Sequence, residues 1–325
     1  METQRRTYLV GMILLLLAAC LWSLNGALIK LTFKGGEGPP AVTIAFYRSL
    51  FAGLFLLPLA RGKFRTLCSA RVSGRDRGGP RGLLQCVMAL RPAAILCVIF
   101  FTAMTACFVL ANTKTGAANV IVLQYTSTFW VFGLSPWLLQ EKPRPGDFWL
   151  LGVAMTGIAI IFAGSAKADF AGLTIALGSG LFFGLLTLMI RQMRDSDSGA
   201  VSVLNNLGSA VLLIPVVLLF GGFELSSRSL VLLIVMGVVQ FGLPYYLYTL
   251  GLARVAAYQA ALVTLLEVVL NPVWTFLAVG EKPPWTTVLG GTVILVALLG
   301  FLLVARNRAT RSITHASTAI LGANE

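Results

Sequence analysis

Residues 255–283 read VAAYQAALVTLLEVVLNPVWTFLAVGEKP, and this stretch decides the fold. Its apolar part, residues 255–278, can cross a bilayer core that is roughly 30 Å thick and needs about 20 apolar residues per helix. It carries one acid, Glu267, near its middle, and the stretch ends in Glu281-Lys282-Pro283. A long apolar run that ends in a charged turn predicts one transmembrane helix of a larger set.

This stretch has a counterpart 140 residues earlier in the chain. Glu141-Lys142-Pro143 matches Glu281-Lys282-Pro283, and residues 114–119 (KTGAAN) match residues 254–259 (RVAAYQ) at the same offset. In both copies a basic residue, small residues and an amide open an apolar run, and the acidic tripeptide follows it. The chain is therefore predicted to contain an internal repeat.

The rest of the chain is apolar in the same way. Of its 325 residues 57% are hydrophobic and 11% are charged, and the mean hydropathy is +0.86. A water-soluble domain cannot hide that much apolar surface, so the composition predicts an all-α integral membrane protein. We predict ten transmembrane helices. Their approximate ranges are 9–33, 40–60, 92–113, 115–139, 146–165, 170–190, 199–221, 229–250, 255–278 and 284–304.

The positive charge predicts topology rather than a nucleic-acid partner. The net charge is +13, and the basic residues lie between and beside the apolar runs. Segment 61–91 has eight Arg and Lys residues against one acid, Asp76, which places it in the cytoplasm by the positive-inside rule. With that segment inside, 18 basic residues fall on the cytoplasmic side and six on the other. Both termini are therefore expected to be cytoplasmic.

Each repeat contains five predicted helices, an odd number, so the second repeat must enter the membrane from the opposite side. We expect a first repeat over residues 1–168, which includes the basic cytoplasmic loop 61–91, an inverted second repeat over 169–305, and a disordered cytoplasmic tail over 306–325. Inverted repeats recur among secondary transporters, whose binding sites lie near the bilayer midplane between the repeats. Duplication that is kept for packing alone is the alternative.

Two ionisable side chains inside the predicted spans are candidates for a site, because such groups are costly in a bilayer and are usually functional. Glu267 lies about 18 Å into its helix from Val255, and Arg48 lies about 12 Å in from Pro40, which is at the other face of the membrane. They bind either each other or the two charges of a zwitterionic solute. For Glu267 three roles stay open: proton carrier, partner of a cationic group on the solute, or structural partner.

Polar and aromatic residues at comparable depth complete the predicted site. Asn271-Pro272 belongs to it because a proline frees a carbonyl one turn back and kinks its helix. The expected substrate-binding or coupling residues are Trp22, Asn25, Arg48, Gln124, Tyr125, Asn205, Gln240, Tyr245, Glu267, Asn271 and Trp274.

Two further patterns predict packing. Gly180 and Gly184 form a GxxxG, which is typical of closely packed membrane helices. The spans 146–165 and 284–304 contain almost no strongly polar residues, so we expect them at the periphery, facing lipid or another copy of the chain.

Three motifs resemble the drug/metabolite transporter superfamily, in particular its EamA-type members. They are residues 19–25 (ACLWSLN), 46–48 (FYR) and 266–274 (LEVVLNPVW), the last of which runs on to Gly280-Glu281-Lys282-Pro283. The resemblance covers nearly the whole chain up to about residue 305. It implies ten helices, a central cavity shared by two halves, and export or exchange of small solutes, but it does not imply one substrate.

Together these observations predict a secondary transporter that exports or exchanges small metabolites such as amino acids by alternating access. The plasma membrane of a bacterium is its expected location, on the resemblance alone. The alternatives are a multidrug or organic-cation exporter, a non-coupled channel and a lipid scramblase.

An enzyme is not expected. The sequence has one histidine, His315, which lies outside every predicted span, and it has no paired intramembrane aspartates and no P-loop motif. We expect no cofactor, no bound metal and no nucleic acid. The expected partners are a small-molecule substrate, the lipid bilayer and, as a candidate coupling ion, the proton. The chain is expected to act as a monomer or a homodimer.

Overall fold

The computed structural model of the chain describes residues 2–33, 38–60, 63–67, 90–115, 117–163, 170–280 and 282–321. Most of the basic segment 61–91, Glu281 of the second Glu-Lys-Pro and the last four residues lie outside this range.

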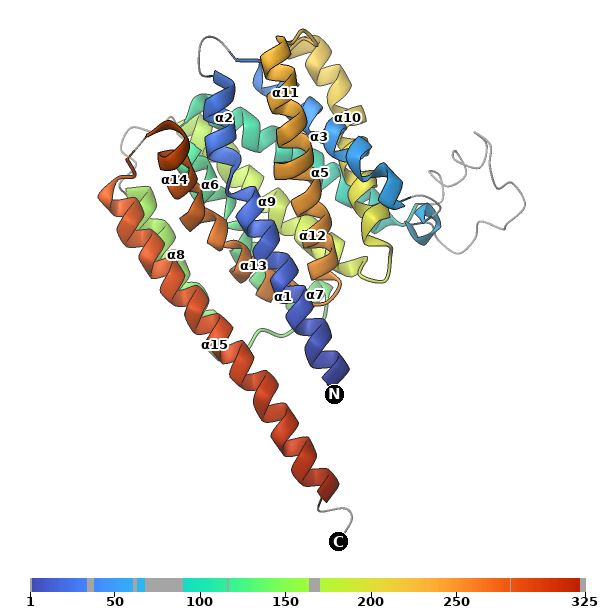
Figure 1. The fold of residues 1–325 in the computed structure, drawn as a ribbon, viewed down its shortest axis with the longest axis vertical. Helices are drawn as coiled ribbons and strands as arrows, with labels where there is room; N and C mark the ends of the chain where they lie inside the picture. Colours follow the sequence, from blue (N-terminus) through green and yellow to red (C-terminus); the bar gives the residue numbers. More distant parts are fainter. Residues whose placement is uncertain are drawn as a thin grey trace, which may run out of the picture.

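The described chain is built from helices (Figure 1). Those of the first half are α1 (Glu2–Trp22), α2 (Asn25–Phe33), α3 (Ala41–Leu56), α5 (Pro92–Lys114), α6 (Ala117–Gln124), α7 (Ser127–Leu138) and α8 (Pro145–Ala163), with the short 3-10 turns η1 (Leu57–Ala60) and η2 (Phe64–Leu67). Those of the second half are α9 (Phe170–Gln192), α10 (Ser198–Phe220), α11 (Ser227–Val235), the π-helical turn η3 (Met236–Gly242), α12 (Leu243–Leu252), α13 (Ala257–Thr264), α14 (Leu266–Val279) and α15 (Trp285–Leu321).

Nine helical stretches in the described part are long and apolar enough to cross a membrane, which confirms a multi-pass helical membrane protein. The predicted span 115–139 is not among them. Here α6 has 8 residues and α7 has 12, and a turn at Tyr125 and Thr126 separates them. At about 1.5 Å per residue neither helix alone reaches across the bilayer. The count of ten spans therefore stays a prediction.

Local chemistry sets several helix ends. Pro92 opens α5 at a position whose N–H would have no partner in any case. The carboxylate of Asp197 caps α10 by accepting a hydrogen bond of 3.0 Å from the backbone N–H of Ala200. After α14 the chain turns at Gly280 with φ 75°, and after α7 it turns at Gln140 with φ 57°. These two left-handed residues are 140 positions apart, the offset of the repeat.

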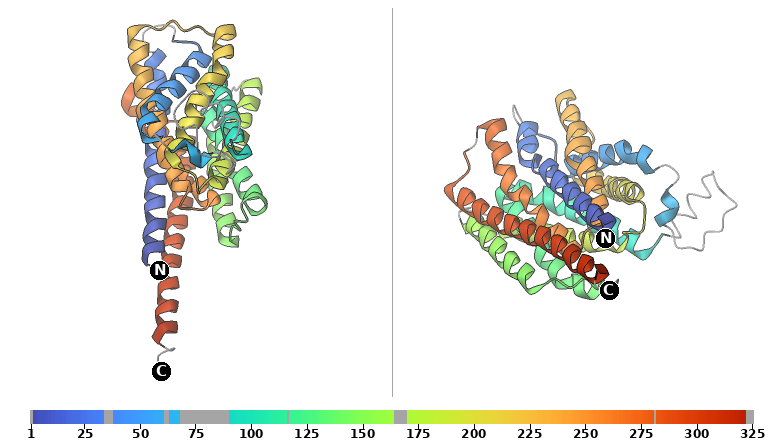
Figure 2. Two further views of the ribbon diagram at one scale, coloured as in Figure 1. Left: turned by 90° about the vertical axis from the view of Figure 1, so that its right-hand side faces the viewer. Right: turned by 60° about the horizontal axis from the view of Figure 1, so that its bottom comes forward.

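The helices form one bundle with both ends of the chain at the same end of it (Figures 1 and 2). The most extensive helix contacts each join the first half to the second: α5 packs on α9, α3 on α10, α1 on α12, and α8 on α15. As expected for the two least polar spans, α8 and α15 lie together along one edge of the bundle (Figure 1). Trp149 of α8 and Trp285 of α15 are each 75% exposed there.

Two predictions about where helices end or are interrupted differ from the structure. The tail, predicted to be disordered from residue 306, continues α15 as a helix to Leu321. Residues 305–321 contain no glycine or proline, so nothing in them breaks the helix. The interruption expected at Pro272 lies instead at Leu265, where α13 ends and α14 begins, and Pro272 sits inside α14.

The GxxxG pattern packs closely, as predicted. A Cβ atom added to Gly180 would lie 2.6 Å from the carbonyl oxygen of Leu123, and one added to Gly184 would lie 3.0 Å from that of Ser127. These carbonyls flank the turn between α6 and α7. The two glycines therefore let α9 lie directly against the interrupted helix.

Replacing Gly180 by alanine is expected to destabilise the protein by about 1–3 kcal/mol, the usual cost of overpacking. The new methyl group would meet backbone at the α6–α7 turn, so α9 would have to move. Gly178→Ala on the same helix is the matched control, because its Cβ would meet nothing closer than the Cys107 sulfur at 3.9 Å. The midpoint temperature of thermal unfolding in detergent should fall by several degrees for Gly180→Ala but not for Gly178→Ala. Equal melting temperatures for the two variants would contradict the close packing.

Candidate solute-binding site

Four interruptions of helical geometry occur in the interior of the bundle. They are the turn at Ser23 and Leu24 between α1 and α2, the turn at Tyr125 and Thr126, the π-helical turn η3, and the break at Leu265. Non-helical backbone at membrane depth is tolerated where it is buried in protein or lines a cavity. π-Helical turns also recur at functional sites. The interruptions therefore mark the place to look for a site.

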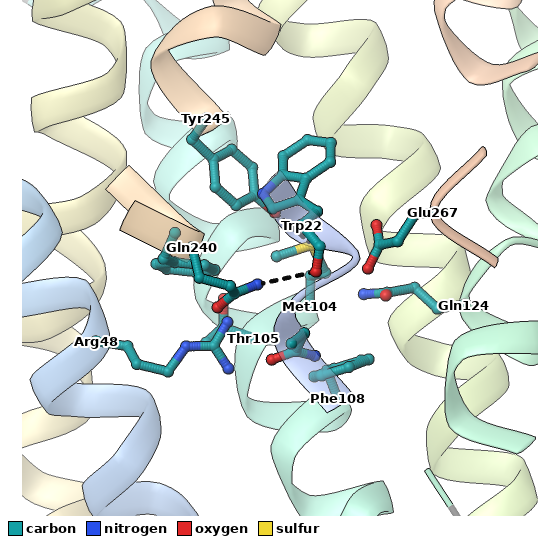
Figure 3. A pocket seen from close by; sticks show the side chains of 11 residues that line it. Trp22, Arg48, Met104, Thr105, Phe108, Gln124, Gln240, Tyr245 and Glu267 are labelled. Atoms are coloured by element: carbon teal, nitrogen blue, oxygen red, sulfur yellow. Dashed lines mark hydrogen bonds between the residues drawn. The ribbon is translucent and has the colours of Figure 1, made fainter. Parts of the chain in front are cut away.

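A cavity lies where the interruptions meet (Figure 3). Its volume is about 40 Å³, room for about three water molecules at roughly 10–15 Å³ each. Helices α3 and α5 supply the walls that the interrupted helices do not. The lining residues are Trp22, Asn25, Arg48, Met104, Thr105, Phe108, Gln124, Gln240, Phe241, Tyr245 and Glu267.

Arg48 is a buried cation that forms no direct ion pair with any residue in the described part of the chain. Its side chain is 3% exposed, and its guanidinium lies 4.4 Å from the ring centre of Phe241. Neither Nε nor Nη1 has a hydrogen-bond partner among the described residues. A cation–π contact offsets only part of the several kcal/mol that burying a charge costs. The site thus has a strong, unsatisfied preference for an anionic group beside Arg48.

Glu267 lines the cavity from the wall opposite Arg48 (Figure 3). It lies in the first turn of α14, where the positive end of the helix dipole favours a carboxylate. Its Oε2 accepts a hydrogen bond of 2.5 Å from the hydroxyl of Tyr125, which sits at the break between α6 and α7. No ion pair in the described part of the chain joins Glu267 to Arg48. The two side chains therefore face the same space without forming a direct ion pair.

Other polar atoms in the wall also lack protein partners. Gln240 donates a weak hydrogen bond of 3.4 Å to the carbonyl of Trp22, and Gln124 donates one of 3.1 Å to Ser179. The buried lining atoms that have no hydrogen-bond partner among the described residues, besides those of Arg48, are Trp22 Nε1, Asn25 Oδ1, Thr105 Oγ1 and Gln240 Oε1. Buried polar groups are normally satisfied, so this concentration indicates a surface built to contact a polar ligand.

Aromatic rings form one side of the cavity. The Trp22 ring lies 4.8 Å from Tyr245 and 5.0 Å from Tyr248, measured between ring centres. Tyr248 and Thr187 share a hydrogen bond of 2.7 Å, and Tyr245 contacts Met104. These fixed rings offer flat apolar surface beside the two charges.

The structure brings most of the predicted site residues together. Trp22, Asn25, Arg48, Gln124, Gln240, Tyr245 and Glu267 line the cavity, and Tyr125 bonds to Glu267. The other three do not line it. Asn205 is buried in α10, Asn271 packs against Gly26 of α2, and Trp274 donates a hydrogen bond of 2.8 Å to Ser23.

Sequence reasoning missed four lining residues, Met104, Thr105 and Phe108 of α5 and Phe241 of η3. Thr105, a polar residue inside an otherwise apolar run, offered a signal. The three apolar residues offered none, because their types are equally common on lipid-facing surfaces. Phe241 matters here for its position under the Arg48 guanidinium, which only the fold determines.

The chain is similar to transporters from bacteria and archaea. A model of the EamA-like transporter family matches residues 9–163 and 170–303. The pseudopaline exporter CntI of Pseudomonas aeruginosa is 27% identical over 294 residues, which cover 89% of this chain and 94% of that protein. The uncharacterized transporter YwfM of Bacillus subtilis is 26% identical over 231 residues, 70% of this chain and 78% of that one.

An uncharacterized transporter of Archaeoglobus fulgidus is 24% identical over 82% of this chain and 88% of its own length. One crystal structure superposes with a TM-score of 0.72 at 17% identity, covering 91% of this chain and 98% of its own. That likeness concerns the fold alone.

Proposed function

The chain belongs to the EamA-like transporter family, and on that premise we propose that it exports small zwitterionic solutes, amino acids first among them, by alternating access. The observation that carries the proposal is that Arg48 and Glu267 lie on facing walls of one buried cavity without a direct ion pair between them. A zwitterion presents an anion to the first and a cation to the second. Export is favoured because one relative over most of the chain is named as an exporter.

The proposed binding mode follows from the donors and acceptors in the wall. Arg48 donates to the solute carboxylate, for which a guanidinium fork is well suited. Glu267 accepts from the ammonium group through the carboxylate oxygen that Tyr125 does not hold. Trp22 and Tyr245 pack against the body of the solute. Space for about three waters is too small for most such molecules, so the cavity must widen when a solute enters.

Widening fits a carrier made of two inverted halves. The breaks at Tyr125 and Leu265 are 140 residues apart, and the family model matches once on each side of residue 165. The contact of α5 with α9 corresponds to that of α12 with α1 when the halves are exchanged. These regularities support two inverted five-helix repeats, ten spans in all, that rock against each other around the cavity.

Contacts between helix ends support the proposed topology. Lys63 pairs with Asp197 at 3.2 Å, and Thr43 bonds to the carbonyl of Gly222 at 2.9 Å. In each pair the charge bias of the sequence puts both residues on the same side of the membrane. Cytoplasmic termini and a bacterial plasma membrane are proposed on this basis and on the bacterial relatives.

Single cysteines in place of Arg75 and Lys282 test this topology. With ten spans, residue 75 lies in the cytoplasm and residue 282 outside, so an impermeant thiol reagent added to intact cells should label only the second. Both sites should react after the cells are opened. Labelling of both residues from one side of the membrane would contradict the inverted repeat.

An exporter of organic cations is the second candidate. The rings of Trp22 and Tyr245, which line the cavity together with the Glu267 carboxylate, resemble a site for a flat cation, since aromatic faces and a carboxylate both attract positive charge. The two candidates differ at Arg48, which attracts a zwitterion and repels a pure cation.

Uptake into proteoliposomes tests the proposed function. The panel comprises labelled amino acids, nucleosides and organic cations, with and without a pH gradient. Saturable uptake of amino acids, competed by the unlabelled compound, is expected. Uptake of cations alone would favour the second candidate. Folded protein that takes up nothing from the panel would count against both and in favour of lipid scrambling.

A further inference from the structure

A partly buried charge cluster lies away from the cavity, at the end of the bundle that holds both chain termini. Its centre is the ion pair between Glu141 and Arg191, with Oε1 and Nε 2.6 Å apart. Both side chains are 11% exposed. Arg191 also donates to the carbonyl of Leu252 at 2.6 Å, and Glu141 accepts from the backbone N–H of Ala257 at 2.8 Å.

These bonds tie the first half to the second. Glu141 follows α7 in the first half, whereas Arg191 ends α9 and the other two partners flank the turn between α12 and α13. Three of the four connected segments lead to the cavity. The stretch before Glu141 holds Gln124 and Tyr125, α12 carries Tyr245, and α13 leads into Glu267. A displacement at the cluster therefore moves cavity walls.

The backbone next to Glu141 is held in an unfavourable conformation. Gln140 has φ 57°, in the left-handed region that costs a non-glycine residue roughly 1–2 kcal/mol. The following N–H, of Glu141, bonds to the carbonyl of Ser135 at 3.3 Å. Gly280, at the equivalent place after α14, takes this conformation at no such cost. The surrounding contacts must therefore offset the cost of the left-handed conformation at Gln140. The resulting turn directs Glu141 into the charge cluster.

We propose that the Glu141–Arg191 pair is the gate that closes the solute path at the terminal end of the bundle and separates when that face admits solute. The inference rests on the proposed alternating-access function. A partly buried pair suits a two-state contact, because its members are stable either bonded to each other or hydrated, and half-broken arrangements leave a poorly hydrated charge without its partner. The pair closes only the face that holds the chain termini, and neither side chain contacts the solute.

The other charged residues near Glu141 and Arg191 cannot take over the role of this ion pair. Arg254, in the turn after α12, donates a hydrogen bond to the carbonyl of Leu250, and Lys142, Arg144 and Arg194 are exposed. Lys142 is thus a matched control, since it adjoins Glu141 in sequence and its side chain points to solvent.

The test places a single reporter cysteine at Thr105, in the cavity wall, in a chain whose native cysteines have been replaced. Reaction with an impermeant thiol reagent is followed in inside-out and right-side-out vesicles. Glu141→Gln is expected to speed labelling from the terminal face at least about tenfold and to slow it from the other face, since losing one gate shifts a two-state population. Arg191→Lys, which keeps the charge but cannot make both bonds, should act in the same direction, and Lys142→Gln should change nothing.

Three outcomes would overturn the proposal. One is an unchanged labelling rate in Glu141→Gln protein that is folded by size-exclusion chromatography and thermal unfolding. Another is an equal rise from both faces, which would mean general loosening. The third is the same shift in Lys142→Gln. A reporter that reacts from neither face in any variant would instead contradict alternating access itself.

Discussion

Replacing Arg48 by glutamine is expected to lower the kcat/KM for zwitterion transport at least about 30-fold. Removing one member of a buried, hydrogen-bonded charge pair costs about 2–5 kcal/mol, and 2 kcal/mol corresponds to roughly 30-fold. The solute carboxylate would face a neutral amide in place of the guanidinium. Initial rates in proteoliposomes across a range of solute concentrations measure the loss.

Stability separates binding from a structural role at this position. Arg48 has no hydrogen-bond partner among the described residues and one ring contact, so glutamine should leave the melting temperature of the solute-free protein unchanged or raise it. Arg48→Lys keeps the positive charge but lacks the two-pronged guanidinium. Its transport rate should therefore lie between those of the wild-type protein and Arg48→Gln. A variant that loses stability and transport together would make Arg48 a structural residue. Full transport by Arg48→Gln would show that Arg48 does not bind the solute carboxylate.

If Glu267 is the proton carrier, replacing it by glutamine should abolish solute accumulation driven by a pH gradient while exchange of solute persists. Glutamine is nearly isosteric and can still accept from Tyr125, but it carries no proton and no charge. Exchange should need about five- to twelvefold more solute, because a hydrogen bond to a charged group is stronger than a neutral one by roughly 1–1.5 kcal/mol. Accumulation and exchange are measured in the same vesicle preparation.

Glu224→Gln is the matched control for this variant, since Glu224 is an exposed acid in the turn between α10 and α11. It should leave both activities intact. Accumulation that survives in Glu267→Gln would show that another group carries the proton. Loss of exchange as well, in folded protein, would leave Glu267 with a binding or structural role and no separate part in coupling.

Much of the fold follows from the sequence because a bilayer constrains it strongly. Long apolar runs must be helices, and the offset of 140 residues appears again in the paired breaks and in the left-handed residues Gln140 and Gly280. What sequence reasoning placed wrongly depends on local backbone geometry. Pro272 is the obvious helix breaker, yet α14 passes through it and the break lies at Leu265, where no residue type signals one.

Part of the candidate site could be predicted because charged residues are rare inside transmembrane spans and therefore stand out in the sequence. Arg48 and Glu267 are conspicuous in sequence, but whether they pair with each other depends on side-chain directions that the fold sets. Asn205 shows the converse. It is polar and buried inside a span, as Gln240 is, but it does not line the cavity. The Glu141–Arg191 pair joins residues 50 positions apart at helix ends, where isolated charges are ordinary in sequence.

The central claim is that one cavity is reached alternately from the two sides of the membrane, and solute exchange tests it most directly. Proteoliposomes are loaded with a labelled zwitterion that the protein transports, and its release is followed with and without unlabelled solute outside. A carrier must return its site across the membrane, so external solute is predicted to speed release several-fold, and to do so saturably. Release that is fast without external solute and indifferent to it would contradict the account and indicate a channel.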